Sequence, residues 1–240
     1  MVAKTKLVRV RFKKRLRRTS TVESFRFSPE ERIEFIPGQF LQIVFDEHNL
    51  GNKELNKYLS FSSSPAHEYV EVTKRLSPSI FSQKLKRLRE NDSCLIKAPL
   101  GNCILRDDYK KIGFLIGGIG ITPVISMLEY IVEEELSTDV ILFYSNRNEE
   151  DVAFKEELDR FQIASSNIKV VYTVTDEEPK RRGYIFGRID SQLILKEDRS
   201  FTERMVFIFG PPRMVEAMKD LCVEVGVPEY LIKTESFLGY

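Results

Sequence analysis

The segment 117–123, Gly-Gly-Ile-Gly-Ile-Thr-Pro, has the residue types of a turn that binds phosphate. Glycines let the backbone approach an anion, Thr122 is a good N-cap residue, and Pro123 suits the first position of a helix. The N-terminus of that helix then offers unpaired N–H groups and a partial positive charge. The segment therefore predicts a nucleotide site. The alternative is a tight turn that only needs positive φ, since Pro123 stands where the full dinucleotide fingerprint has its third glycine.

The sequence gives little support for a metal site or for the active site of a hydrolase. Cys94, Cys103 and Cys222 are too scattered for a zinc site or an iron–sulfur cluster, and no C-x-x-C occurs. We expect these cysteines to be buried structural thiols, and we expect no bound metal. The two histidines are His48 and His67, and the G-x-S-x-G elbow of a serine hydrolase is missing. These patterns disfavour metal-dependent and nucleophilic hydrolysis.

The composition is that of an ordinary globular protein: 240 residues, 42% hydrophobic, 30% charged, with a net charge of +1. Residues 1–18 nevertheless hold nine Lys or Arg and no acid. We expect a strand there, with Val8, Val10 and Phe12 facing the core and the intervening basic residues facing solvent. A docking patch for an acidic partner is the alternative, and nucleic acid is the least favoured partner. Neither a membrane span of about 20 apolar residues nor a secretory signal is found, so we expect a cytoplasmic protein without membrane insertion.

The first part of the chain has the spacing of a small β-barrel. Short β-rich runs are separated by Pro, Gly and Asn turns, and six such runs predict a six-stranded antiparallel barrel. A helix over 80–88 interrupts them, and its N-terminus offers a second place for an anion. The composition shifts near residues 106–111, so we assign 1–107 to this domain. The predicted strands are 7–12, 24–27, 40–45, 58–62, 69–73 and 93–98.

From residue 108 to 240, strands alternate with helices. This pattern predicts an α/β domain with a doubly wound, five-stranded parallel sheet, whose ligands lie at the carboxyl ends of the strands. Two turns stand at such ends: the glycine turn 117–123 and the segment Gly210-Pro211-Pro212. Helices are predicted after the glycine turn, over 151–161 and over 213–225. The predicted strands are 112–116, 140–144, 168–173, 205–209 and 230–233.

Five motifs occur in an order that is informative as a set. They are Pro-Gly-Gln-Phe at 37–40, Ser-Phe-Ser-Ser-Ser-Pro at 60–65, the glycine turn at 117–123, Gly-Pro-Pro-Arg-Met at 210–214 and Glu-Ser-Phe-Leu-Gly-Tyr at 235–240. Together they resemble the ferredoxin-NADP reductase family of flavoproteins. The resemblance covers nearly the whole chain. It implies a flavin-binding barrel followed by a nicotinamide-nucleotide domain, with hydride passing between the two rings at the domain cleft.

The resemblance places the flavin on the barrel. The family's Arg-x-Tyr-Ser motif falls on Lys57, Tyr58, Leu59 and Ser60, where Ser60 is positioned to hydrogen-bond the flavin ring. Lys57 replaces an arginine that would hold phosphate with two hydrogen bonds, and Leu59 replaces an aromatic residue. Leu59 covering the ring and Tyr58 contributing from the other strand face both stay open. FAD is favoured over FMN. The further flavin-binding residues that the resemblance implies are Thr73, Lys74, Phe81 and Ser82.

The resemblance places the dinucleotide on the α/β domain. Ser145, Asn146 and Arg147 lie where the family reads the adenosine ribose. Because Arg147 could hold a 2′-phosphate and no acid stands at the strand end, the residues lean towards NADPH, although Asn146 also suits NADH. Arg181 and Arg182 are expected to form a solvated basic loop. The residues that the resemblance places at the nicotinamide half are Gly118, Gly120, Thr122, Gly210 and Pro211.

The resemblance assigns the reaction itself to Ser60, Thr122, Glu235 and Phe237, with Tyr240 as a further residue over the flavin. Phe209 stands where the family often has a cysteine, which puts the nicotinamide fit in doubt.

The implied activity is that of an NAD(P)H-dependent FAD oxidoreductase that passes electrons to a ferredoxin-like protein, a partner subunit or a small acceptor. The basic N-terminus favours an acidic carrier. The first alternative is a non-catalytic flavin- or nucleotide-binding electron-transfer or interaction subunit of a larger complex. The second is an unrelated Rossmann-type enzyme such as a transferase, which would bind nucleotide without flavin.

Overall fold

The computed structural model describes residues 4–237, and they form two compact units. Unit 1 is the chain up to Leu105 together with Thr122–Tyr130. Unit 2 is Arg106–Ile121 together with the chain from Ile131 onward. One helix is therefore divided between the units, and the domain boundary between residues 107 and 108 stays a prediction.

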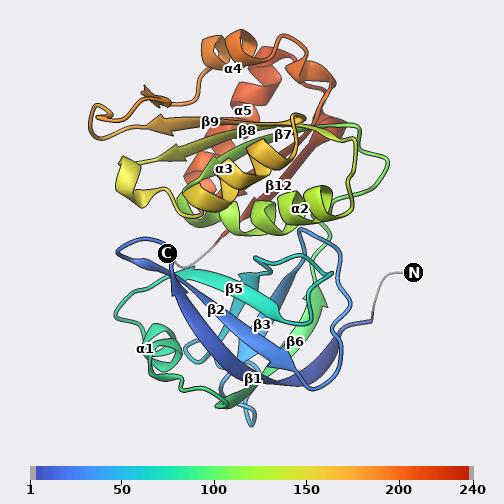
Figure 1. Ribbon diagram of the computed structural model, residues 1–240, viewed down its shortest axis with the longest axis vertical. Coiled ribbons are helices and arrows are strands. Elements are labelled where there is room, and N and C mark those ends of the chain that lie inside the picture. The colour runs from blue at the N-terminus through green and yellow to red at the C-terminus, as the bar shows by residue number, and fades with distance from the viewer. Residues whose placement is uncertain (1–3, 238–240) are drawn as a thin grey trace. The chain divides into compact units, whose positions relative to one another are not determined.

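Unit 1 contains a six-stranded antiparallel sheet that closes into a barrel, as the sequence predicted (Figure 1). The strand order is β4-β3-β6-β1-β2-β5. The two edges meet just after β4, where Phe61 forms a bridge with Val72 and the Ser62 N–H donates to the Glu71 carbonyl at 2.8 Å. The strands are β1 (Lys6–Arg17), β2 (Val22–Pro29), β3 (Phe40–Val44), β4 (Asn56–Ser60), β5 (Val70–Arg75) and β6 (Ser93–Leu100).

The barrel core follows the period-two pattern of the strands. Val8, Val10 and Phe12 of β1 are buried, which confirms the inward face predicted for the basic N-terminal strand. Helix α1 (Ile80–Arg87) covers this core with Phe81 and Leu85, both fully buried. The helix begins where the Ser79 hydroxyl accepts the N–H of Ser82, as expected of a serine N-cap.

Unit 2 contains a six-stranded sheet in which every pair is parallel, in the order β10-β9-β8-β7-β11-β12. The predicted count of five is wrong. The missed strand, β10, has only three residues and follows a polar, glycine-containing segment, so no apolar run marks it. It pairs Tyr184 with Tyr172. The strands are β7 (Lys111–Gly117), β8 (Asp139–Asn146), β9 (Ile168–Val174), β10 (Tyr184–Phe186), β11 (Met205–Gly210) and β12 (Ile232–Ser236).

Helices cover both faces of this sheet, with α3 on one face and α4 and α5 on the other (Figure 1). Helix α3 starts at Lys155 rather than at 151 because Phe154 is buried in the left-handed conformation, φ 62°, after a 3₁₀ turn at Glu149–Asp151. Helix α5 ends at Gly226 as predicted. The helices are α2 (Ile121–Glu133), α3 (Lys155–Ala164), α4 (Ser191–Glu197) and α5 (Pro212–Val225).

Two of the three cysteines are buried as expected, Cys94 and Cys222, and burial raises the pKa of each thiol to about 12. Cys103 is partly exposed, so the expectation of a buried thiol was wrong for this residue.

Among residues 4–237, no helix is both long enough and apolar enough to cross a membrane.

Candidate functional site

Two lysines of unit 1 come together at neighbouring strand ends of the barrel. Lys57 lies on β4 and Lys74 on β5. Burial, and after it the nearby positive charge of Lys57, lowers the pKa of Lys74. In the described part of the chain, neither lysine has a carboxylate within ion-pair distance. Two partly buried cations without an internal counter-ion favour binding of an anion.

A cluster of serine hydroxyls lies at the start of α1, shortly after Lys74. The Ser79 hydroxyl lies 3.0 Å from that of Ser77 and 3.1 Å from that of Ser82. Ser82 and the Phe81 side chain are fully buried, and the Ser82 N–H already donates to the Ser79 hydroxyl, so the donor offered to a ligand here is the backbone N–H of Phe81. The helix start and the lysine pair therefore both favour an anion, and phosphate suits both.

The predicted flavin motif on β4 is split between two faces of the strand. Leu59 pairs with Leu41 and packs at the edge of the barrel core, and Lys57 shares its face. Tyr58 points the other way, is 60% exposed, and meets Phe40 edge-on with ring centroids 5.8 Å apart. Ser60 is buried. The structure thus separates Tyr58 from the lysine pair.

The Thr73 side chain is less available to bind flavin than the sequence suggested. Its hydroxyl lies 2.6 Å from that of Ser24 and 2.7 Å from that of Ser62, and the residue is 2% exposed. Its side chain is therefore occupied within the barrel wall. Any contact of Thr73 with a ligand would have to come from the backbone.

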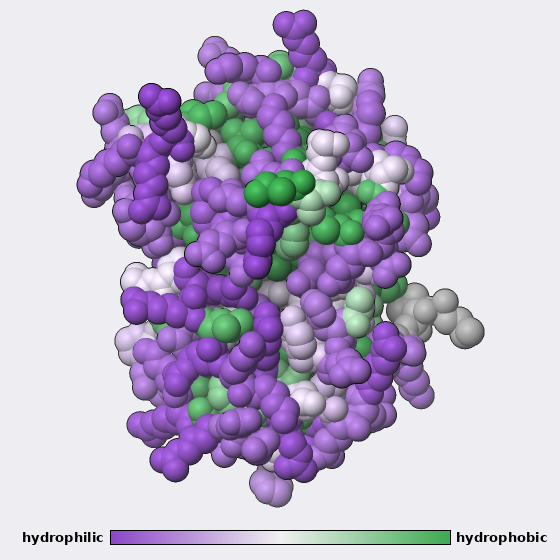
Figure 2. Space-filling view, viewed as in Figure 1, coloured by the Kyte–Doolittle hydropathy of each residue, from purple (hydrophilic) through white to green (hydrophobic). Residues whose placement is uncertain are grey.

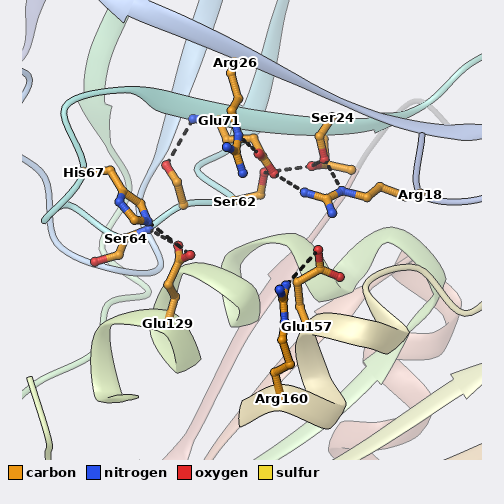
Figure 3. A network of polar contacts seen from close by, with 12 residues as sticks. Arg18, Ser24, Arg26, Ser62, Ser64, His67, Glu71, Glu129, Glu157 and Arg160 are labelled. Atoms are coloured by element: carbon orange, nitrogen blue, oxygen red, sulfur yellow. Dashed lines mark hydrogen bonds and ion pairs between the residues drawn. The ribbon is translucent and has the colours of Figure 1, made fainter. Parts of the chain in front are cut away.

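This hydroxyl chain continues into a buried ion-pair network that the sequence analysis missed (Figure 3). The Glu71 carboxylate, 2% exposed, accepts from Arg18 at 2.9 Å and from Arg26 at 2.6 Å. The signal in the sequence was a glutamate inside an apolar strand, because a buried carboxylate needs cationic partners. The arginines that provide them come from β2 and from the turn that precedes it.

The same view shows how α2 is attached to the barrel within unit 1 (Figure 3). Glu129 of α2 accepts the N–H of Ser64 at 2.7 Å, and its other oxygen lies 3.1 Å from His67 Nε2. The Ser126 hydroxyl donates to the Ser63 carbonyl at 2.7 Å. The serine-rich segment after β4 therefore holds the helix that follows the glycine turn.

The glycine turn of unit 2 is more compact than predicted. Residues Gly118–Gly120 form a 3₁₀ turn, with Gly118 at φ 51°, and α2 begins directly at Ile121. Thr122 is therefore already helical and is not the N-cap, because the turn itself supplies the helix start. Thr122 is buried, and Pro123 still lies in the first helical turn, where a missing N–H is tolerated.

The turn's glycines are needed for close packing. A Cβ on Gly120 would overlap the carbonyl oxygen of Phe209, and one on Gly117 would overlap the sulfur of Met214. The same sulfur would lie 2.9 Å from a Cβ on Gly210. The structure thus gives these glycines a packing role in addition to the anion-binding role that the sequence suggested.

The end of β8 holds an unsatisfied amide. Asn146 is 6% exposed, and neither its side-chain oxygen nor its nitrogen has a hydrogen-bond partner among the described residues. Leaving such a group unpaired costs about 1–3 kcal/mol, so a polar ligand or water is expected there. Ser145 beside it is half-buried and Arg147 is exposed. The three residues predicted to bind the adenosine half therefore differ in solvent exposure. Of the three, Asn146 has the side chain whose buried polar atoms lack hydrogen-bond partners.

The end of β12 places a carboxyl group beside Phe209. Glu235 pairs with Phe209 in the β11–β12 ladder, and burial raises its pKa to about 7. The Phe237 N–H donates to the Gly210 carbonyl at 3.0 Å. Pro211 is exposed and precedes α5 directly. Tyr240 lies outside the described residues.

Comparison with known proteins gives a matching family model and many relatives. Residues 114–220 match the family described as oxidoreductase NAD-binding domain. The flavohemoprotein of Bacillus subtilis (strain 168) is 29% identical over 231 residues, covering 93% of this chain and 57% of the relative. The 2-halobenzoate 1,2-dioxygenase electron transfer component of Burkholderia cepacia is 28% identical over 200 residues, covering 80% and 55%. The chain thus spans little more than half the length of these curated relatives.

Solved structures show the same fold. A ferredoxin NADP⁺ reductase from Neisseria gonorrhoeae with bound FAD and NADP has a TM-score of 0.80 at 20% identity, covering 97% of this chain and 99% of that one. The ferredoxin reductase in carbazole 1,9a-dioxygenase has a TM-score of 0.82 at 21% identity, covering 99% and 71%. The predicted combination of an antiparallel barrel and a parallel α/β sheet is confirmed.

Proposed function

Because this chain belongs to the ferredoxin-NADP reductase family of flavoproteins, we propose that it is an oxidoreductase that transfers hydride from NADPH or NADH to bound FAD and passes the electrons to a separate acceptor. The observation that carries this proposal is the lysine pair of the barrel. Lys57 and Lys74 are partly buried cations with no ion-pair partner among residues 4–237. The phosphates of a flavin nucleotide would supply the missing negative charge.

Each unit contributes its own part of the binding chemistry. In unit 1, the lysine pair and the N–H groups at the start of α1 would hold the pyrophosphate, and the buried Ser60 hydroxyl would orient the flavin ring. In unit 2, the amide of Asn146 would bind a ribose hydroxyl of the dinucleotide. FAD held there would supply the redox chemistry between the nicotinamide and the acceptor.

Glu235 can hold a proton near the proposed reaction. With its pKa raised to about 7, the carboxyl is partly protonated at neutral pH, so it can both donate and accept a hydrogen bond. Phe237 and Thr122, also predicted to take part in the reaction, carry no titratable group. We infer that Thr122 positions the rings and that Phe237 covers the nicotinamide position until the nucleotide displaces it.

The electron acceptor is proposed to be an acidic protein, because exposed cations are concentrated on the last part of β1 and on helix α1. Arg15 of β1 donates to the Lys86 carbonyl at 3.1 Å, which joins the last part of β1 to α1. We call the exposed cations of these two segments the basic face. Figure 2 shows that most of the visible surface is hydrophilic. The basic face consists of Lys13, Lys14, Arg15, Arg17, Lys84, Lys86 and Arg87.

The first half of β1 contributes less to such a surface because its cations are already paired. Lys6 lies 2.6 Å from Glu31 and Arg9 lies 3.0 Å from Glu47. Among residues 4–237, the basic face beyond them forms one ion pair, Arg15 with Glu23 at 3.8 Å. Charge reversal at Lys14 and Lys86 should slow electron transfer to an acidic ferredoxin at low salt. It should leave reduction of ferricyanide unchanged.

The test of the function is spectroscopic. The purified full chain, supplied with FAD, should show flavin absorbance, and anaerobic mixing with NADH or NADPH should bleach it at rates on the order of 1 s⁻¹ or faster, as expected of an enzyme. Bound flavin that neither nucleotide reduces would instead identify a non-catalytic electron-transfer or interaction subunit. Nucleotide binding without any flavin would identify an unrelated Rossmann-type enzyme.

A further inference from the structure

We propose that Glu149 makes the dinucleotide site selective for NADH over NADPH by occupying the basic loop that would otherwise bind a 2′-phosphate. This inference rests on the proposed function and deepens it. It reverses the preference that Ser145 and Arg147 suggested in the sequence, because the structure brings an acid to that strand end from outside the strand.

Glu149 lies in the 3₁₀ turn directly after β8, and its side chain is only 7% exposed. The carboxylate accepts the backbone N–H of Arg181 at 3.1 Å and also that of Lys180. Its second oxygen lies 3.5 Å from Arg181 Nε. Two N–H donors and one guanidinium form an anion-binding arrangement, and here a side chain of the same protein already fills it.

This arrangement lies at the strand end where a dinucleotide is expected. The chain leaving β9 returns over the end of β8: the Thr175 N–H donates to the Asn146 carbonyl at 3.1 Å, and the Asp176 N–H donates to the Arg147 carbonyl at 3.0 Å. The buried, unpartnered amide of Asn146 belongs to the same strand end. Ribose recognition in doubly wound folds takes place there, with an acid selecting the 2′-hydroxyl and an arginine accommodating a 2′-phosphate.

The charges of the two loops also oppose a 2′-phosphate. Segments 147–151 and 175–182 together hold six carboxylates against four cations. Arg181, one of those cations, is engaged by Glu149. A 2′-phosphate would add a further negative charge of about −1.5 to −2 beside this surplus. It would have to displace Glu149 from its donors or bind next to it.

The experiment measures binding of two fragments, 5′-AMP and 2′,5′-ADP, to the FAD-loaded full chain by titration calorimetry. The natural protein should prefer 5′-AMP. Glu149→Gln should raise affinity for 2′,5′-ADP by about tenfold, while 5′-AMP changes by less than about twofold. Glu150→Gln is the matched control, because it removes the same charge from the exposed neighbouring residue. Stopped-flow reduction by NADH and NADPH should follow the same order.

Three binding results would overturn the proposal. The first is that the natural protein binds 2′,5′-ADP more tightly than 5′-AMP. The second is that Glu149→Gln and Glu150→Gln raise the affinity for 2′,5′-ADP equally. The third is that Arg181→Ala lowers the affinity for 2′,5′-ADP but not that for 5′-AMP. The Arg181→Ala measurement decides the question even if Glu149→Gln does not fold. Failure of NADH and NADPH alike to reduce bound FAD would contradict the proposed function. Reduction by NADPH alone would contradict only this inference.

Discussion

The ring of Phe237 stacks on that of Phe209, with centroids 6.3 Å apart and planes 7° apart. Phe209 is fully buried and stands where the family often has a cysteine. Phe237 is held over the end of β11 both by this stacking and by its hydrogen bond to Gly210. The larger residue at position 209 therefore has an aromatic partner within unit 2.

Phe237→Ala should strengthen binding of the pyridine nucleotide. Phe237 covers the strand end where a nicotinamide would lie, and an aromatic pair contributes about 0.5–1.5 kcal/mol. A ligand that displaces the ring loses that contribution, so KM for NADH should fall by about three- to tenfold in the variant. Steady-state kinetics check this, with Tyr230→Ala as control because Tyr230 is 80% exposed. A raised KM would show that Phe237 supports the nucleotide instead.

Removing either lysine of the barrel pair should weaken flavin binding. Lys57→Ala or Lys74→Ala deletes one of two cations that form no ion pair within the described part of the chain, so the Kd for FAD should rise by about tenfold or more at low salt. Fluorescence titration of the apoprotein measures this. Lys86→Ala is the control, since Lys86 is exposed on α1. Unchanged Kd values in both pair variants would place the phosphates elsewhere.

Glu71→Ala should destabilise the barrel strongly. The change leaves Arg18 and Arg26 partly buried without their carboxylate, which costs about 3–5 kcal/mol. Urea denaturation of the full chain gives the free energy of unfolding. Glu31→Ala breaks an exposed pair with Lys6 and should cost no more than about 1 kcal/mol. An equal decrease in the free energy of unfolding of the two variants would mean that the buried ion pairs of Glu71 stabilise the barrel no more than an exposed pair does.

Glu235 should make stability fall as the pH rises through neutrality. Its pKa is raised from 4.5 to about 7 by burial, so the folded state binds a proton that the unfolded state releases. Stability from this group is complete below about pH 4.5 and is lost as the pH passes about 7. At pH 8, Glu235→Gln should exceed the natural protein in free energy of unfolding by at most about 3 kcal/mol.

At pH 4.5 the free energies of unfolding of the two proteins should agree to within about 0.5 kcal/mol, because the natural carboxyl is then protonated in the folded state and half protonated in the unfolded state. Chemical denaturation at the two pH values measures the difference. A Gln variant that is less stable at both would contradict the assigned burial effect.

Much of the fold could be predicted because its apolar periodicity is local. Every predicted strand overlaps an observed one, and the end of α5 at Gly226 follows from a single glycine. The start of α3 could not be predicted, since it depends on the left-handed Phe154, and β10 is too short and polar to stand out. These elements are defined by tertiary packing rather than by their own residues.

The candidate site was less predictable because its decisive contacts are non-local. The sequence placed Asn146 at a strand end, but its unpaired amide depends on what surrounds it in three dimensions. The position of Glu149 beyond the strand gives no signal in the sequence, and its partners Lys180 and Arg181 come from the loop after β9. The role of Glu71 likewise depends on its ion pairs with two arginines that lie far from it in the sequence, near the N-terminus.

The Met214 sulfur, which lies against both Gly117 and Gly210, ties together two turns that are far apart in the sequence. A larger residue at position 117 or 210 would fit only if the side chain at position 214 moved or became smaller. The two glycine motifs should therefore vary together rather than independently. A library that randomises positions 117, 210 and 214 jointly would recover folded combinations that single substitutions miss.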